Sequence, residues 1–194
     1  LQFGSKAGGD GNIKHTGSNL QISETTGNIQ ITNYNTDGDV VLSSDDGSGG
    51  ETAYITLDGG EVITKFHKPI TVSGSINQGI TSATEDATVV IDLSSGNYFN
   101  ITLGANVTDI DFTNGTDGQR FLIRFTQPGG ANYSIAYNAV THDQDGGGSP
   151  ANVTIKWAGG ITHAMTRTNA KADTIGFIIN DENAFDGFII GQNL

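Results

Sequence analysis

Turn residues recur about every ten positions in the first part of this chain, and a short alternating segment follows each turn. The clearest copies of this unit are residues 17–22, 26–31 and 37–42. Alternation places every second side chain on the same face of a strand. The chain also has 28 glycines, and no segment carries helical periodicity over three turns. The sequence therefore predicts an all-β protein.

Charge and cysteine content exclude several classes of protein. The chain has 9 Lys and Arg against 21 Asp and Glu, a formal net charge of -12. A nucleic-acid-binding surface is basic, and an anionic membrane also attracts basic groups, so neither partner is expected. No apolar run approaches the roughly 18 residues of a spanning helix. The absence of cysteine excludes disulfides, thiolate zinc sites and a cysteine nucleophile.

The chain is predicted to consist of a repetitive β stem at residues 1–75, a linker at 76–84 and a head domain at 85–194. Each stem strand supplies only two inward aliphatic side chains, too few to bury a core within one chain. The strands can stack as a solenoid, or three chains can share an axis in a β-prism-like arrangement. In the trimeric alternative, the shared core consists of Leu20, Ile22, Ile29, Ile31, Val40 and Leu42.

Longer and more apolar strands are predicted in the head. They cover residues 88–93, 98–103, 107–112, 120–126, 133–137, 153–157, 174–179 and 185–190. Phe121, Ile123 and Phe125 alternate with polar neighbours and are expected to point inward. About eight strands separated by turn signals are typical of a β-sandwich or jelly roll.

Both halves resemble structural proteins of tailed bacteriophages. In the first half the resemblance lies in Asp10-Gly11-Asn12-Ile13, Thr26-Gly27-Asn28-Ile29 and Asp37-Gly38-Asp39-Val40. In the second half it lies in residues 98–112 and 118–123, Lys156-Trp157-Ala158-Gly159-Gly160 and Phe185-Asp186-Gly187-Phe188. The resemblance implies a homotrimer that attaches to other virion proteins at one end and displays a head at the other. It also implies a location on the tail or head surface of a virion, outside the cell. Because position 1 is Leu and the sequence opens within a β-like pattern, we expect the chain to be a fragment, a processed product or the ordered part of a longer protein.

The spacing of histidine and aspartate residues gives little support for a metal site. The four histidines, at positions 15, 67, 142 and 163, contain no His-x-His pair, so turn or surface histidines are expected. One histidine per protomer on a threefold axis is the alternative. Asp143 and Asp145 are the best candidates for Ca²⁺, but the sequence does not complete an EF-hand. No cofactor is therefore expected, with Ca²⁺ at these two residues as the alternative to a solvated turn.

Sugar binding is favoured over catalysis. The sequence has no Gly-x-Ser-x-Gly elbow, and the repeat region is too short for the long groove of a tailspike depolymerase, so an enzyme is not expected. Aromatic faces beside planar polar groups recognise sugars. The candidate receptor- or glycan-binding residues are Tyr133, Tyr137, Asn138, His142 and Trp157. A core position is the alternative for Trp157.

The sequence and the resemblance together predict a non-enzymatic virion appendage, a trimeric tail fibre with a receptor-binding head. Its expected partners are further copies of itself, other virion proteins and a glycan or protein on the host cell surface. A capsid decoration or head-fibre protein is the main alternative. A small polysaccharide depolymerase and a secreted bacterial adhesin or surface-layer module are further alternatives.

Overall fold

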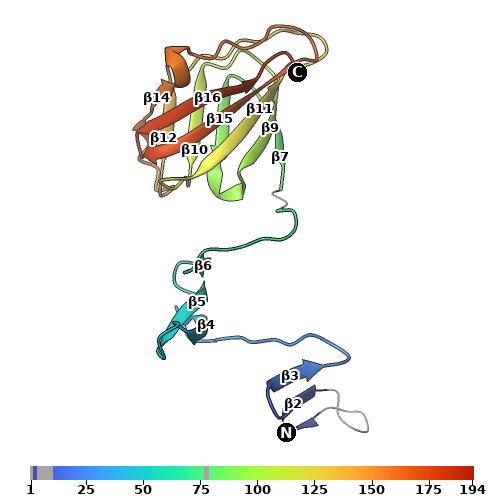
Figure 1. Ribbon diagram of the computed structural model, residues 1–194. Helices are drawn as coiled ribbons and strands as arrows, with labels where there is room; N and C mark the ends of the chain where they lie inside the picture. The colour runs from blue at the N-terminus through green and yellow to red at the C-terminus, as the bar shows by residue number, and fades with distance from the viewer. Residues whose placement is uncertain (1, 4–10, 77–78) are drawn as a thin grey trace. The chain divides into compact units, whose positions relative to one another are not determined.

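Strands dominate the computed structural model, which describes residues 2–3, 11–76 and 79–194. Of the described residues, 47% are in strands and 3% in helices, and the chain divides into two units, residues 1–74 and 75–194 (Figure 1). No helix in the described ranges is long and apolar enough to cross a membrane.

Residues 1–74 contain two separate antiparallel sheets of three strands each. The first consists of β1 (Gln2–Phe3), β2 (Gly11–His15) and β3 (Leu20–Glu24). The second consists of β4 (Val40–Asp45), β5 (Glu51–Asp58) and β6 (Ile63–Phe66). The turn between β4 and β5 is fixed locally, because Asp46 Oδ1 accepts hydrogen bonds from the backbone N–H groups of Ser48 (2.8 Å) and Gly50 (3.1 Å).

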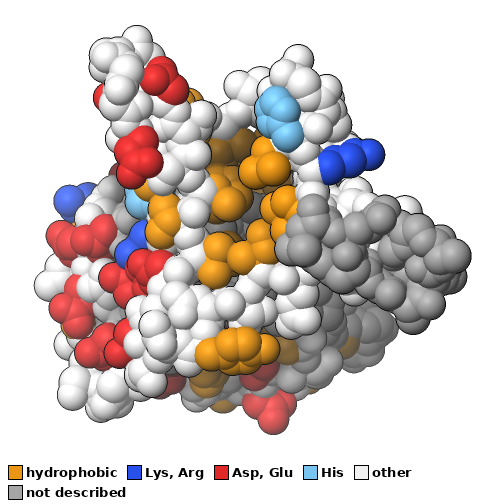
Figure 2. Space-filling view, turned by 90° about the horizontal axis from the view of Figure 1, so that it is seen from below, with side chains coloured by type: hydrophobic (Ala, Val, Ile, Leu, Met, Phe, Trp, Pro, Cys, Tyr) orange, Lys and Arg blue, Asp and Glu red, His pale blue; other side chains and the backbone are white. Residues whose placement is uncertain are grey.

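This first unit buries almost none of its apolar side chains. Among its described residues, only Gly11 and Thr56 are buried. The side chains of the expected trimer core stay open to solvent, with Leu20 70% and Ile31 64% exposed. Ile22, Ile29 and Leu42 are also exposed, and Val40 is half-buried. Exposed hydrophobic and acidic side chains can be seen in the space-filling view of Figure 2. A single copy of residues 1–74 therefore has no apolar core among its described residues.

Residues 75–194 form two mixed sheets. The six-stranded sheet has the order β14-β16-β15-β11-β9-β7 and the four-stranded sheet the order β13-β12-β10-β8. The strands of the larger sheet are β7 (Thr81–Glu85), β9 (Tyr98–Leu103), β11 (Arg120–Thr126), β14 (Thr154–Trp157), β15 (Ala172–Asp181) and β16 (Ala184–Gly191). Those of the smaller sheet are β8 (Thr88–Asp92), β10 (Asp109–Thr113), β12 (Val140–Asp143) and β13 (Ala151–Asn152). Two short 3₁₀ helices are η1 (Leu93–Ser95) and η2 (Ala158–Gly160).

From β7 to β12 the chain alternates between the two sheets. β7, β9 and β11 lie parallel in the larger sheet, and β8, β10 and β12 lie parallel in the smaller one. Parallel neighbours need a crossover connection, which is usually a helix. Here each strand of one sheet serves as the crossover for the other. Two later strands then pair antiparallel with the last strand of each parallel set. β15 pairs with β11, and β13 pairs with β12.

In-register winding stacks inward side chains into ladders. Ile91, Phe112 and His142 stand opposite one another on β8, β10 and β12. Phe112 also contacts Phe121 of the other sheet, with ring centroids 5.3 Å apart, so the two sheets face each other across a common core. The fully buried members of that core include Val89, Ile101, Ile123, Phe125, Ile175 and Phe185.

The predicted fold class is wrong in its architecture, although the predominance of strands partly fits the all-β expectation. Neither a repetitive β-prism nor a solenoid is found in the described residues of 1–74, which form two short antiparallel sheets. The head is not a jelly roll, because its six-stranded sheet contains three parallel pairs. Strand alternation reports which face is buried but carries no information on the direction of the neighbouring strand. Connections as short as residues 86–87 suggest a hairpin, yet this one leads from one sheet to the other.

Some individual elements also differ from expectation. Residues 29–31 and 133–137 are not strands, and the second segment makes only an isolated bridge, Val107 to Ile135. Residues 81–84 of the expected linker belong to β7, which pairs with β9. The strand β12 was not predicted. Only one of its four residues, Val140, is aliphatic, and two of the others are His142 and Asp143.

Neighbouring residues of β11 provide a test of the core. Ile123 is fully buried, whereas Leu122 points to the outer face and is 37% exposed. We expect Ile123→Ala to lower the free energy of unfolding by about 2–5 kcal/mol and Leu122→Ala by less than about 1.5 kcal/mol. Urea unfolding followed by the fluorescence of Trp157, the single tryptophan, measures both. Equal losses would contradict the assignment of the inner face.

Candidate functional site

Three of the predicted glycan-binding residues line one pocket. Tyr137, Asn138 and Trp157 surround a hollow of about 490 Å³, together with Val153, Thr154, Ile155 and Thr162. None of these seven side chains carries a charge. We refer to this hollow as the aromatic pocket.

The strands place Trp157 against both the core and the pocket. Trp157 ends β14, which runs parallel to β16 with Gly187 opposite. A Cβ atom at Gly187 would lie 2.8 Å from Trp157 Cε3, so the glycine gives the indole its space. The Trp157 ring meets Tyr137 edge to face at a centroid distance of 4.9 Å and Phe177 at 6.0 Å. The indole is half-buried, so the core alternative and the pocket alternative each describe one part of its surroundings.

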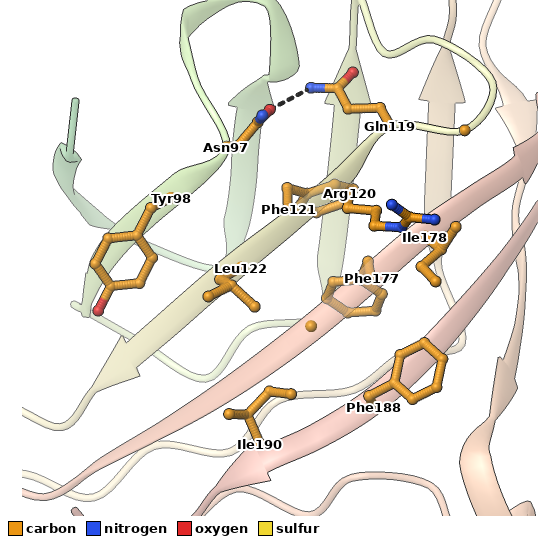
Figure 3. Close-up of a pocket in the computed structure, with 12 residues that line it drawn as sticks. Asn97, Tyr98, Gln119, Arg120, Phe121, Leu122, Phe177, Ile178, Phe188 and Ile190 are labelled. Carbon is orange, nitrogen blue, oxygen red and sulfur yellow. Dashed lines mark hydrogen bonds between the residues drawn. The ribbon is translucent and has the colours of Figure 1, made fainter. Parts of the chain in front are cut away.

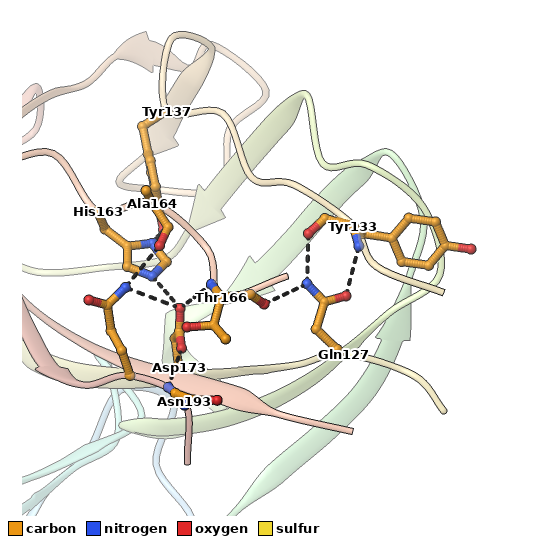
Figure 4. Close-up of polar contacts among 9 residues, drawn as sticks. Gln127, Tyr133, Tyr137, His163, Ala164, Thr166, Asp173 and Asn193 are labelled. Atoms are coloured by element: carbon orange, nitrogen blue, oxygen red, sulfur yellow. Dashed lines mark hydrogen bonds and ion pairs between the residues drawn. The ribbon is translucent and has the colours of Figure 1, made fainter. Parts of the chain in front are cut away.

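A buried polar network fixes Tyr137 from behind (Figure 4). The Tyr137 hydroxyl lies 2.8 Å from His163 Nδ1, and His163 Nε2 lies 2.9 Å from Asp173 Oδ2. The carboxylate of Asp173 also accepts hydrogen bonds from the backbone N–H groups of Thr166 (2.7 Å) and Asn193 (2.9 Å). Asp173 thereby ties the segment before β15 and the C-terminal residues to the wall of the pocket.

Burial sets the protonation states in this network. Desolvation lowers the pKa of His163, against the opposing effect of its hydrogen bond to Asp173. Burial and the negative charge of Asp173 raise the pKa of Tyr137 well above its usual value. Although burial raises it, hydrogen bonds from Thr166, Asn193 and His163 hold the pKa of Asp173 below its usual range. A neutral imidazole that accepts from Tyr137 and donates to the Asp173 carboxylate satisfies all three groups.

This arrangement orients Tyr137. Its hydroxyl lies within hydrogen-bond distance of His163 Nδ1, and its raised pKa keeps it protonated. The pocket offers two aromatic rings, the amide of Asn138 and the hydroxyls of Thr154 and Thr162. Apolar faces beside neutral hydrogen-bonding groups match the chemistry of an uncharged sugar.

The other two predicted glycan-binding residues lie elsewhere. Figure 4 shows the ring of Tyr133 directed away from Tyr137, and its backbone is held by Gln127, whose Nε2 donates to Tyr133 O at 2.7 Å. His142 is fully buried. Its Nδ1 lies 3.0 Å from the backbone oxygen of Glu182, and its ring meets Phe185 at 5.2 Å. A receptor cannot reach His142 in this position, because the side chain belongs to the ladder of Ile91 and Phe112.

The acidic residues suggested for Ca²⁺ are engaged with their own loop. Asp143 Oδ2 accepts from Gly148 N–H at 2.6 Å, and Asp145 Oδ1 accepts from Gly147 N–H at 2.9 Å. Across the described part of the chain, no group of three or more His, Asp or Glu side chains is arranged to hold a metal ion. Ca²⁺ at these two carboxylates stays a prediction.

Sequence reasoning did not single out His163 or Asp173. One signal was present, since Asp173 carries the one charge in the mostly apolar run from Ala172 to Ile179. A carboxylate on the buried face of a strand needs hydrogen-bond donors. Which groups supply them depends on contacts 7 to 20 residues away, and no spacing rule predicts these.

Comparisons with protein-family models, with curated proteins and with solved structures found no significant match.

The neutral state of His163 predicts a pH dependence of stability. An unfolded histidine has a pKa near 6.5, and the pKa of His163 lies lower in the folded chain. As the pH falls below about 6.5, the imidazole of His163 therefore binds a proton in the unfolded state before it does so in the native state. We expect the free energy of unfolding to fall as the pH drops from about 7 to about 5.

His163→Gln isolates this contribution. The fall in stability over the same pH range should be smaller in this variant than in the wild type, whereas His15→Gln, at an exposed histidine, should leave it unchanged. Urea unfolding monitored by Trp157 fluorescence at each pH gives the comparison. An identical pH dependence of wild type and His163→Gln would contradict the assignment.

Proposed function

We propose that this chain is a non-enzymatic structural appendage of a phage virion, a homotrimeric tail fibre whose head binds a surface glycan of the host. Residues 1–74 associate with the same residues of two further copies and with other virion proteins. The aromatic pocket of residues 75–194 is the glycan-binding site. The resemblance of the sequence to virion structural proteins supports the virion location.

The exposed aliphatic side chains of residues 1–74 carry the proposal. Fully burying a Leu or Ile side chain contributes about 1.5–3 kcal/mol, so covering one that is half exposed contributes about 1 kcal/mol. Leu20, Ile22, Ile29, Ile31 and Leu42 each expose more than half of their surface in a single copy. Further copies of the chain offer the same apolar side chains, and threefold association buries them against one another.

The head is suited to display. Residues 75–194 have their own buried core, so their fold does not depend on association. Three copies of one pocket on one particle raise a weak single-site affinity by avidity. Binding of an uncharged sugar follows from the neutral lining of the aromatic pocket.

An array of bacterial surface polysaccharides tests the glycan site. Asn138 is exposed at the pocket, whereas Asn132 is exposed away from it. We expect Asn138→Ala to weaken binding to the neutral glycan that the wild type retains by about tenfold, through the loss of its hydrogen bonds. Asn132→Ala should bind as the wild type does. An assembled protein that retains no glycan would overturn the receptor-binding role, and capture by purified capsids would then favour a decoration protein.

Avidity predicts a second effect. Replacing Ile22 and Ile29 by Ser removes two exposed apolar side chains from residues 1–74, and we expect apparent affinity for a glycan-coated surface to fall by about a hundredfold. Ile161→Ser, at an exposed apolar residue of the head, is the matched control and should change affinity little. Unfolding monitored at Trp157 should stay the same in both variants. Undiminished surface binding by the double variant would contradict association through residues 1–74.

A further inference from the structure

The outer face of the six-stranded sheet carries an apolar stripe between two arginines. In register across the sheet stand Tyr98, Leu122, Gly176 and Phe188, on β9, β11, β15 and β16. On β11, Arg120 and Arg124 flank Leu122 on the same outward face. Figure 3 shows Tyr98 and Phe188 at opposite sides of the stripe, with Leu122 and Ile190 between them. The stripe lies in a shallow groove of about 620 Å³, the outer groove. Arg120 lines this groove, and Arg124 lies next to it on the same outward face of β11.

Gly176 gives this groove its hollow. A Cβ atom at this position would lie 3.2 Å from Leu122 Cδ2 and 3.3 Å from Ile190 Cδ1, so any larger residue would fill the space between them. The amide of Asn97 and that of Gln119 close one end, joined by a hydrogen bond of 2.9 Å. The groove therefore has an apolar floor, aromatic sides and a polar end.

The two arginines have no anionic partner in the described residues. Neither makes an ion pair or a side-chain hydrogen bond there, whereas Lys65 pairs with Asp58 at 2.7 Å and Glu61 at 2.8 Å. Among the residues in register with Arg120, Leu122 and Arg124 across the sheet, the one carboxylate is Asp186. It lies two strands from Arg120, and it stands opposite Lys156. In a chain of net charge -12, two unpaired guanidinium groups on one face form a local site for an anion.

We propose that the outer groove binds an acidic polysaccharide, a chain of uronic acid units. The apolar face of a pyranose ring stacks on aromatic side chains such as Tyr98 and Phe188. A guanidinium group recognises a carboxylate through two parallel hydrogen bonds. Arg120 and Arg124 are four residues apart on a strand, about 13 Å, so they engage carboxylates on different sugar units of an extended chain. This site is distinct from the aromatic pocket, whose lining is neutral.

A second copy of this chain is a poorer occupant. The head has its own core, and of the apolar groups in the groove Leu122 is 37% and Ile190 61% exposed. Charge rather than apolar area therefore decides between the two occupants. Protein interfaces that bury unpaired arginines supply carboxylates against them. An acidic saccharide neutralises both arginine charges directly.

Binding of the full chain to polygalacturonate, with dextran as the neutral probe, tests the proposal. We expect polygalacturonate to be retained and dextran not, with affinity falling as salt rises from about 0.05 M to 0.5 M. Arg120→Gln and Arg124→Gln should each weaken binding by at least about tenfold. The matched control is Arg167→Gln, at the third arginine, which lies outside the strands of the six-stranded sheet and donates to Asn132 O, and this variant should bind as the wild type does.

Two further measurements decide the chemical class. Tyr98→Leu should weaken binding of polygalacturonate but not of poly-L-glutamate, which presents carboxylates without sugar rings. Equal affinity of the wild type for both polymers would overturn the saccharide assignment, because charge alone would then suffice. A change of mass in solution in Arg120→Gln would also overturn it and identify the groove as a contact between copies. Failure of the wild type to bind polygalacturonate would overturn this inference. It would not affect the proposed neutral-glycan site in the aromatic pocket, which Asn138→Ala tests separately.

Discussion

Burial of one apolar layer between two sheets determines the structure of residues 75–194. The chain reaches this layer by alternating between the sheets, so that Ile91, Phe112 and His142 on one side and Phe121 and Phe177 on the other meet at the centre. Both proposed sites depend on that layer. The strand β15 carries Asp173 into the network behind the aromatic pocket, and on its outer face it carries Gly176 into the outer groove. One core thus supports both proposed sites.

The first unit lacks such a layer. Its strands alternate as regularly as those of the head, but each sheet has only three short strands, and most of the described aliphatic side chains stay in solvent. Sheets of this size are marginal in water unless another surface covers them. The contrast between the two units is the physical reason for assigning association to residues 1–74 and ligand binding to residues 75–194.

Alternation in the sequence was sufficient to predict which residues of the head point inward. Phe121, Ile123 and Phe125 are buried as expected, because a strand with one wet face must alternate. Strand direction was not predictable, since a connection of two residues permits either a hairpin or a step to the other sheet. The position of His142 followed from its register with Phe112, which is a long-range property. Tyr137, Asn138 and Trp157 were correctly grouped as neighbours, whereas the support from His163 and Asp173 depends on tertiary contacts.

The mass of the chain in solution tests the central claim most directly, that residues 1–74 are covered by other copies of the chain. Light scattering at high concentration should give about three times the 20.2 kDa of one chain. On dilution the mean mass should fall towards that of one chain as the trimer dissociates. A mass of one chain at every concentration would contradict the claim. The exposed aliphatic side chains of Leu20 to Leu42 would then need a different partner altogether.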